Sequence, residues 1–273
     1  MFGERINSLD ITCDGLWLIQ GLLRLEQLPA TLLLMPVVTA APAPTEDPRL
    51  EPLREAGIVS EDNAVHPQVS KWLTDLSSPD VELGIHMDGP QQIRAVIVRK
   101  GDVHTAAVRM GDDVSIYPVP GISTIVELAE CAQSLLPPVD AAQVPAISLP
   151  QSDLLGAVSR MIDDESISPR LELERMGLRP EQASVLAQAI DRPGMESAFV
   201  FTNYPFGEPE VSGVGAAVID TEDGRLVVGP GRDADGTERT NVLAGTAGRV
   251  TEAIVAAAER LPAGHGWFDA HRA

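Results

Sequence analysis

The histidines, cysteines and carboxylates of this chain show no spacing that would bind a catalytic metal ion. Five histidines are present: His66, His86, His104, His265 and His271. None belongs to an HxxxH or HExxH sequence, the spacing that places two imidazoles on one face of a helix. The segments 220–224 (DTEDG) and 232–238 (RDADGTE) contain part of a calcium-loop pattern but lack its full ligand series. We expect hairpin turns at both positions, and no metal.

Nucleophile and nucleotide-binding motifs are missing from the sequence as well. It contains no GxSxG, no Walker A sequence and no GxGxxG, since GVG at 213–215 has Val218 at the position of the third glycine. Paired acids such as Asp163 and Asp164 could serve acid–base catalysis only if the fold buried them. We therefore expect a protein that is not an enzyme and holds no cofactor. The competing hypothesis, a small-molecule enzyme, predicts a deep pocket with a strongly perturbed carboxylate.

The charge of the chain limits the classes of partner that it can bind. The formal net charge is -20, with 20 Lys and Arg against 40 Asp and Glu in 273 residues. No run rich in Lys or Arg occurs, which argues against nucleic acid and anionic membranes as partners. The first residues show no signal-peptide pattern, and four prolines interrupt the longest apolar stretch, 28–44. Cys13 and Cys131 lack CxxC spacing and suit buried, reduced thiols. These features predict a soluble, cytoplasmic protein without membrane insertion.

The elements that must position any site can be predicted from hydrophobic periodicity and turn residues. The expected strands of the first half are 8–12, 31–38, 81–87, 93–99, 103–109 and 114–119. The expected helices are 14–25, 48–57, 66–76 and 122–136. Short turns between the four later strands predict hairpins and therefore an antiparallel sheet. Helical spacing predicts burial of four residues on the last helix of each half: Ile125, Val126, Ile254 and Val255.

The second half of the sequence repeats the order of elements in the first. After a Pro-rich linker at 139–145, a strand and a helix recur, and LERMGL at 173–178 matches LREAGI at 53–58. Gly177 and Gly57 hold equivalent positions. Four strand-like runs and a final helix then follow: 197–204, 213–220, 225–230, 238–243 and 248–262.

We predict that residues 1–138 and 146–273 are diverged copies of one strand–helix–helices–meander–helix unit joined by the linker 139–145. Two such units side by side would form a single compact α+β molecule. The predicted fold class is therefore α+β, internally duplicated and pseudo-twofold, with a central antiparallel or mixed β-sheet and helical bundles.

Four of the ten aromatic residues fall in one short stretch of the second half. Alternation along the strand places Phe199 and Phe201 on one face, which we expect in the core. Tyr204 and Phe206 fall in the loop that follows. Exposed aromatic side chains on a loop suit a protein-binding anchor. Equally, both rings could fold back over the edge of the sheet.

Four segments, in matching order, resemble the EspG family of actinobacteria, which comprises chaperones associated with ESX (type VII) secretion. They are DITCDGLWLIQGLL at 10–23, LREAGIVSEDNAVHPQVSKWL at 53–73, DTEDGRLVVGPGRD at 220–233 and TEAIVAAAERLPAGHGWFD at 251–269. The resemblance covers essentially the full chain, and its motifs are patterns of apolar and turn residues without catalytic groups. Two features depart from the family pattern: the turn MDGPQQ is short, and the insert AAPAPTEDP at 40–48 is additional.

The resemblance implies a cytoplasmic chaperone that binds the helical tip of the PPE subunit of a PE–PPE heterodimer, keeps it soluble and delivers it for secretion. It also implies a quasi-twofold fold with a central sheet and helical bundles. A surface that shields an apolar tip needs apolar or aromatic anchors ringed by polar groups. The partner-binding residues we expect are Tyr204, Phe206, Arg225, Arg232, Asp235 and Arg239, with Gln91 and Arg94 from the first half.

Two alternatives remain open at this stage. The arginines could merely balance neighbouring acids on a solvated face. The chain could also be an acidic homodimeric interaction module, which pairs an exposed sheet edge with its own copy and has no secretion client.

Overall fold

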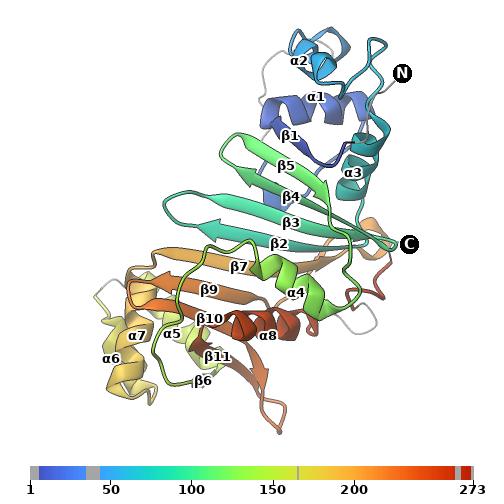
Figure 1. The fold of residues 1–273 in the computed structure, drawn as a ribbon. Coiled ribbons are helices and arrows are strands. Elements are labelled where there is room, and N and C mark those ends of the chain that lie inside the picture. The colour runs from blue at the N-terminus through green and yellow to red at the C-terminus, as the bar shows by residue number, and fades with distance from the viewer. Residues whose placement is uncertain (1–5, 35–43, 165, 262–265, 272–273) are drawn as a thin grey trace.

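A computed structural model describes the chain in four ranges: residues 6–34, 44–164, 166–261 and 266–271. One antiparallel sheet runs through the molecule, with the first half of the chain at one end and the second half at the other (Figure 1). The predicted α+β class is confirmed. The strands are β1 (Leu9–Thr12), β2 (Val81–Asp88), β3 (Ile93–Lys100), β4 (Val103–Met110), β5 (Asp113–Pro118), β6 (Ile147–Pro150), β7 (Met195–Asn203), β8 (Glu210–Val211), β9 (Ala216–Thr221), β10 (Gly224–Arg232) and β11 (Glu238–Ala244).

The sheet order is β1-β5-β4-β3-β2-β7-β9-β10-β11-β6, and the short β8 pairs with β7. From edge to centre, the first half contributes β1, β5, β4, β3 and β2, and the second half contributes β6, β11, β10, β9 and β7. The halves meet where β2 pairs with β7, from Val81 opposite Asn203 to Asp88 opposite Glu196. A duplicated unit would produce this matched order. The duplication itself stays a prediction, which superposition of the two halves would test.

The helices follow the order expected from the sequence. They are α1 (Cys13–Leu23), α2 (Leu50–Glu55), α3 (Pro67–Ser77), α4 (Ile125–Gln133), α5 (Gln151–Asp163), α6 (Pro169–Arg175), α7 (Pro180–Asp191) and α8 (Ala247–Ala258), with 3-10 turns η1 (Ala30–Leu32), η2 (Pro44–Glu46) and η3 (Pro205–Gly207). Helices α2 and α6 end alike, because Gly57 and Gly177 both have positive φ. The N–H after each glycine, that of Ile58 or Leu178, donates to a carbonyl five residues back. Within the described ranges, none of the helices has the length and apolar content needed to cross a bilayer.

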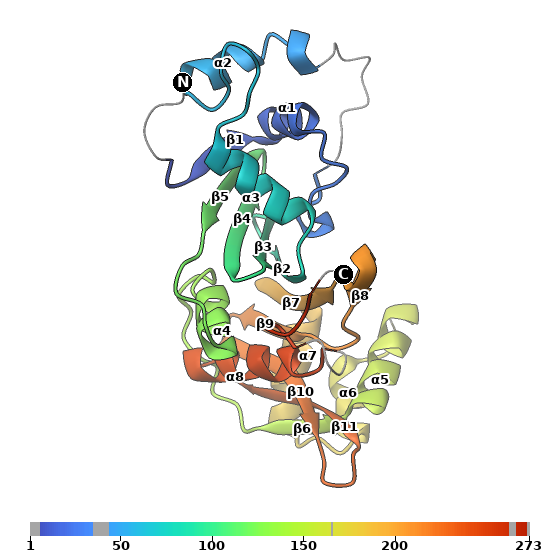
Figure 2. The ribbon, with the colours of Figure 1, turned by 90° about the vertical axis from the view of Figure 1, so that its right-hand side faces the viewer.

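Alternate residues of each strand enter different cores. On β3, Ala95 and Ile97 contribute to a core that also holds α4 and α8, whereas Val96 and Val98 contribute to a core with α1 and α3. A third core packs α6 and α7 against β10, β11 and β6. Figure 2 shows α4 and α8 on one side of the sheet and α5 and α6 on the other. The sheet is therefore covered on both faces, which explains its largely apolar strands.

The C-terminal segment 266–271 packs onto the first of these cores. The Trp267 ring is 3% exposed and meets Phe201 edge-to-face at 6.0 Å between centroids. Its indole N–H donates to Nε2 of His104 at 3.1 Å. The buried Arg99 guanidinium donates to the carbonyl oxygens of Trp267, at 2.6 Å, and of Ala270. The tail thus joins β3 and β4 of the first half to β7 of the second.

One of the predictions about buried residues was wrong. Ile254 is buried as expected and Ile125 and Val255 are half-buried, but Val126 is 46% exposed. Helix α4 begins at Ile125, behind the capping residue Thr124, and Ile125 packs against the core, so the adjacent Val126 lies on the outer side of the same turn. The buried face of α4 is formed by later residues: Leu128, Ala129 and Ala132. Both cysteines are free thiols; Cys13 is buried and Cys131 half-buried.

The strand expected at 31–38 is also wrong where the structure describes it. Residues 30–32 form the 3-10 turn η1, and 35–38 lie outside the described residues. The turn buries Leu32, and the carbonyl oxygens of Leu32 and Leu33 accept hydrogen bonds from Arg109 of β4. These contacts hold the segment across the sheet instead of along its edge. The insert 40–48 is described only from residue 44, where η2 begins.

Candidate partner-binding surface

Two of the arginines expected at the partner surface are buried. Arg225 donates from Nε and Nη2 to the carboxylate of Asp220, at 2.7 and 2.8 Å, and from Nη2 to the carbonyl of Pro137 at 2.8 Å. Its backbone N–H donates to the carbonyl of Asp140, and its carbonyl accepts from the N–H of Ala142. Arg225 therefore attaches the linker to β10 and is not available to a partner in this conformation.

Arg94 is likewise held within the chain. Its guanidinium donates to Asp88 at 2.6 Å and to the carbonyl oxygens of Met87 and Ile93 at 3.1 and 3.0 Å. These contacts close the β2–β3 hairpin. Gln91, in the turn of that hairpin, is exposed. Of the two first-half candidates, only Gln91 presents its side chain to solvent.

The remaining polar candidates share the β10–β11 hairpin. Arg232 is exposed and its Nε donates to Glu238 across the hairpin at 2.7 Å. Asp235, at the tip, accepts from the N–H of Thr237 at 2.9 Å, and this hydrogen bond holds its pKa below the ordinary value. Arg239 is half-buried and donates to the backbone carbonyl of Ser148 on β6 at 2.7 Å. The structure brings these three side chains together on one exposed hairpin.

Phe206 is displayed to solvent. Its side chain is 84% exposed, the highest value among the large apolar residues that the structure describes. It lies in η3 with φ of 54°, a left-handed conformation that bulky side chains rarely adopt. Of the two outcomes left open for the loop aromatics, the exposed one holds for Phe206. An exposed aromatic ring on a strained backbone residue is a feature of binding sites.

Tyr204 anchors the same loop. Its hydroxyl donates to Oε2 of Glu82 on β2 at 2.7 Å, and Thr31 of η1 donates to Oε1 of Glu82 at 2.7 Å. Glu82 is 3% exposed. Burial raises the pKa of Glu82, while the hydrogen bonds from Thr31 and Tyr204 partly oppose that shift. A Cβ on Gly84 would lie 2.6 Å from the Thr31 hydroxyl, so glycine lets η1 approach the carboxylate. Glu82 thus joins the first half to the loop that presents Phe206.

Replacing Glu82 with Gln should stabilise the protein at neutral pH but not at pH 4. The folded-state pKa of Glu82 lies above the ordinary value of 4.5. The stability that protonated Glu82 contributes is therefore fully present below pH 4.5. It is lost as the pH rises through the folded-state pKa. Gln does not ionise, so its advantage should grow by about 1.4 kcal/mol for each unit of the raised pKa. Urea unfolding between pH 4 and pH 8 measures this difference.

The exposed Glu196 of β7 supplies the matched control for this substitution. Glu196→Gln should change stability by the same small amount at every pH. If the free energy of unfolding of Glu82→Gln differs from that of wild type by the same amount at pH 4 and pH 8, Glu82 does not cause the pH dependence of stability.

A second group of exposed apolar side chains was not expected from the sequence. Helix α5 presents Leu155 and Ile162 to solvent, the latter 74% exposed, and α6 presents Leu171. On β8, Val211 is also exposed. Among the described residues, the four most exposed large apolar side chains all belong to the second half: Phe206, Ile162, Leu155 and Val211.

The sequence did contain a signal for α5. Its apolar residues occur as the adjacent pairs Leu154–Leu155 and Met161–Ile162, seven residues apart. One member of each pair is enough to cover the core, since Leu154 and Met161 face inward. The second members form an extra stripe on the outer face. No group of three or more His, Cys, Asp or Glu residues suited to a metal ion occurs in the part of the chain that the structure describes.

Comparison with known proteins assigns the chain to a family. The EspG family model matches residues 12–256. The ESX-1 secretion-associated protein EspG1 of Mycobacterium tuberculosis is 27% identical over 278 residues, which cover 97% of this chain and 91% of that protein. The ESX-5 secretion-associated protein EspG5 of the same organism is 26% identical over 243 residues, 80% of each chain.

A solved structure shares the fold. It is the Mycobacterium tuberculosis type VII secretion system chaperone EspG5 in complex with the PE25–PPE41 dimer, which matches with a TM-score of 0.80 and 22% identity over 97% of this chain and 100% of that chain. The family match extends from the start of α1 into α8, and so includes both halves of the sheet. The chain belongs to the EspG family.

Proposed function

We propose that the chain is a cytoplasmic chaperone of type VII secretion that binds a PE–PPE heterodimer at the helical tip of the PPE subunit. Binding would keep the heterodimer soluble and target it for secretion. The observation that carries this proposal is the match to the EspG family over residues 12–256. The EspG5 structure that shares the fold is itself a complex with a PE–PPE dimer.

The exposed apolar side chains of the second half suit this function. An apolar tip is shielded from water most effectively by apolar and aromatic anchors surrounded by polar groups. Phe206 and Val211 supply one such group, and Leu155 and Ile162 of α5 supply another. The charged β10–β11 hairpin supplies polar groups in the same half. A net charge of -20 would keep the loaded chaperone soluble and repel other copies.

Co-expression with each PE–PPE pair of the same genome tests the proposal. The chain would be captured by an affinity tag and the product measured by native mass spectrometry. A heterotrimer with one copy of each subunit supports the chaperone function and identifies the client. A chain recovered alone with every pair, or only as a homodimer, would overturn the proposal and favour the homodimeric module.

Charge reversal on the β10–β11 hairpin should weaken capture of the client without unfolding the chain. Arg232→Glu removes an exposed guanidinium, and Glu238 retains Arg260 as a second partner at 3.1 Å. Loss of a charge at the rim of an interface mainly slows association and alters its salt dependence, so we expect about a fivefold loss of affinity at low salt. Arg239→Glu should have a similar effect.

Arg249→Glu on α8 is the control, because Arg249 is an equally exposed arginine paired with a glutamate, Glu252. It should leave affinity unchanged. Titration calorimetry that gives wild-type affinity for both hairpin variants would remove Arg232 and Arg239 from the proposed surface.

A further inference from the structure

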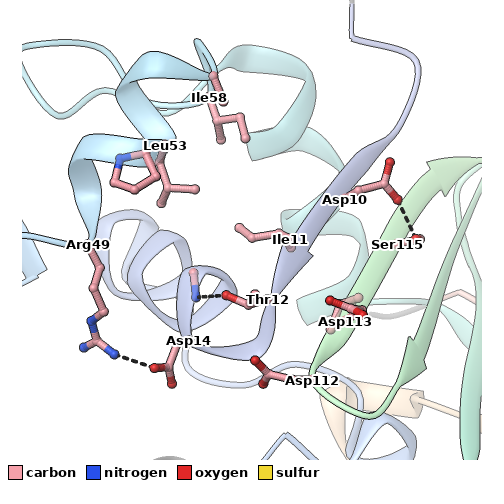
Figure 3. A pocket seen from close by; sticks show the side chains of 14 residues that line it. Asp10, Ile11, Thr12, Asp14, Arg49, Leu53, Ile58, Asp112, Asp113 and Ser115 are labelled. Atoms are coloured by element: carbon pink, nitrogen blue, oxygen red, sulfur yellow. Dashed lines mark hydrogen bonds and ion pairs between the residues drawn. The ribbon is translucent and has the colours of Figure 1, made fainter.

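A cavity lies at the opposite edge of the sheet from β6, between β1 and α2, and plays no part in the proposed client surface. Its volume is about 780 Å³, within the range of sites that enclose ligands. Figure 3 shows Ile11, Leu53 and Ile58 pointing into the space between the strand and the helix. Four carboxylates line the same cavity: Asp10, Asp14, Asp112 and Asp113. The cavity therefore combines an apolar wall with an acidic one.

The wall formed by β1 is the free edge of the sheet. Among the described strands, β1 has β5 as its single neighbour. The N–H of Cys13 donates to the carbonyl of Asp112 at 2.9 Å. In an antiparallel pair, the residues that bond to the neighbour alternate with residues that face away. Ile11 therefore bonds toward β5, and the backbone N–H and C=O of Asp10 and the N–H of Thr12 face the open edge. Such groups are a template for another strand.

The two faces of the sheet at this edge have opposite character. Leu9 of β1 and Val114 of β5 are buried, and Ile11 shares their face. Asp10 and Asp113 lie on the other face and are exposed. A strand added beside β1 would therefore place alternate side chains against apolar groups and against carboxylates.

The charge of the cavity indicates the charge of the ligand that would bind there. Arg49 is the one cationic side chain in its lining, and it is already paired with Asp14 at 2.7 Å and with Asp47 at 2.7 Å. In the described part of the chain, no ion pair includes Asp10, Asp112 or Asp113; Asp10 accepts from the Ser115 hydroxyl at 2.5 Å. The unneutralised carboxylates favour a cationic partner.

We propose that this edge binds an extended peptide segment of a protein partner in which basic and apolar residues alternate. The segment adds to β1 as a strand, so that its backbone pairs with Asp10 and Thr12. Its basic side chains meet Asp10 and Asp113, and its apolar side chains enter the space beside Ile11, Leu53 and Ile58. The site is separate from the surface proposed for the PE–PPE client and does not depend on it.

The test uses the full chain and the peptide Lys-Val-Lys-Val-Lys-amide with fluorescein on its N-terminal amine, and binding is followed by anisotropy at low salt. Replacing every Lys with Glu should reduce affinity at least tenfold. Two further peptides carry N-methyl groups, one on the lysines and one on the valines. Because a strand at a sheet edge pairs through alternate residues, one methylated peptide should lose at least tenfold in affinity and the other should bind almost normally.

Variants of the chain complete the test. The double substitution Asp10→Asn with Asp113→Asn retains side-chain shape and should reduce the affinity for the Lys-Val peptide at least tenfold. The matched control, Glu222→Gln with Asp223→Asn, makes the same change of net charge in the exposed β9–β10 turn and should have no effect. Equal binding of the Lys and Glu peptides, equal sensitivity to both methylation patterns, or equal effects of the two double variants would each overturn the proposal.

Discussion

Trp267→Ala should lower the free energy of unfolding by about 3–5 kcal/mol, the usual cost of deleting a buried aromatic side chain. The Trp267 ring fills the core beside Phe201, and its N–H is satisfied by His104. The substitution leaves a cavity and also removes the buried hydrogen bond that His104 accepts. Urea unfolding of the full chain, followed by circular dichroism, measures the change as a lower midpoint.

Phe268→Ala is the matched control for this prediction. Phe268 is the adjacent aromatic residue and also contacts the His104 ring, at 6.2 Å between centroids, but it is 37% exposed. Its replacement should cost about 1 kcal/mol, the scale of an aromatic pair. Equal losses for the two variants would show that the tail stabilises the fold without the specific insertion of Trp267.

The same contacts predict how acid affects the tail. Burial, with the nearby Arg99, lowers the pKa of His104 from 6.5 to about 4. Between these values the unfolded chain takes up a proton on His104 that the folded chain excludes. The stability that neutral His104 contributes is therefore present above pH 6.5 and is lost as the pH falls toward 4. His104 must remain neutral because its Nε2 accepts the indole N–H.

Phe206→Ala should weaken binding of the PE–PPE client by about 30-fold, or about 2 kcal/mol, the threshold of an interface hot spot. The ring is almost fully in solvent in the free chain, so the loss arises in the complex. Its removal should leave thermal stability nearly unchanged, because no core contact is lost. Titration calorimetry with the purified heterodimer measures the affinity, and a thermal melt checks the fold.

Val126→Ala on α4 is the control, since Val126 is also an exposed apolar residue but lies on the face of the sheet opposite α5 and α6. It should bind like wild type. A Phe206→Ala variant with wild-type affinity would place the client interface elsewhere on the chain, with the α5 stripe of Leu155 and Ile162 as the next surface to substitute.

The buried arginines show how far sequence reasoning can locate a site. Arg225 lies directly opposite Asp220 across the β9–β10 hairpin, and Arg94 lies near Asp88 across the β2–β3 turn. Both carboxylates follow from the predicted turns, so the pairing was available from hairpin register. The burial of these arginines could not be predicted from hairpin register, because it depends on the linker and neighbouring strands that cover each guanidinium. Arg94 and Arg225, two of the four arginines expected at a binding surface, are therefore buried in ion pairs within the chain.

The misplacement of Val126 and of η1 has a related cause. Helical periodicity marks which side of a helix is apolar, but not how wide a stripe of that side the neighbouring elements cover; Ile125 packs against the core and the adjacent Val126 does not. Residues 31–34 are as apolar as a strand, yet Arg109 and the carboxyl of Glu82 hold this segment across the sheet. Contacts between residues more than fifty positions apart carry no local signal.

The sequence by itself determined most of the elements, their hairpin connections and the α+β class, because alternation and turn residues are local properties of the chain. The lack of catalytic motifs and the EspG likeness were equally visible in it. Only the tertiary structure decided that β2 and β7 join the two halves into one sheet, that the C-terminal tail inserts Trp267 into its core, and that Phe206 stays exposed. It also decided that β1, which has β5 as its single neighbour among the described strands, lies at an acidic edge. Each of these depends on long-range packing, in which the burial of one side chain is set by elements distant in sequence.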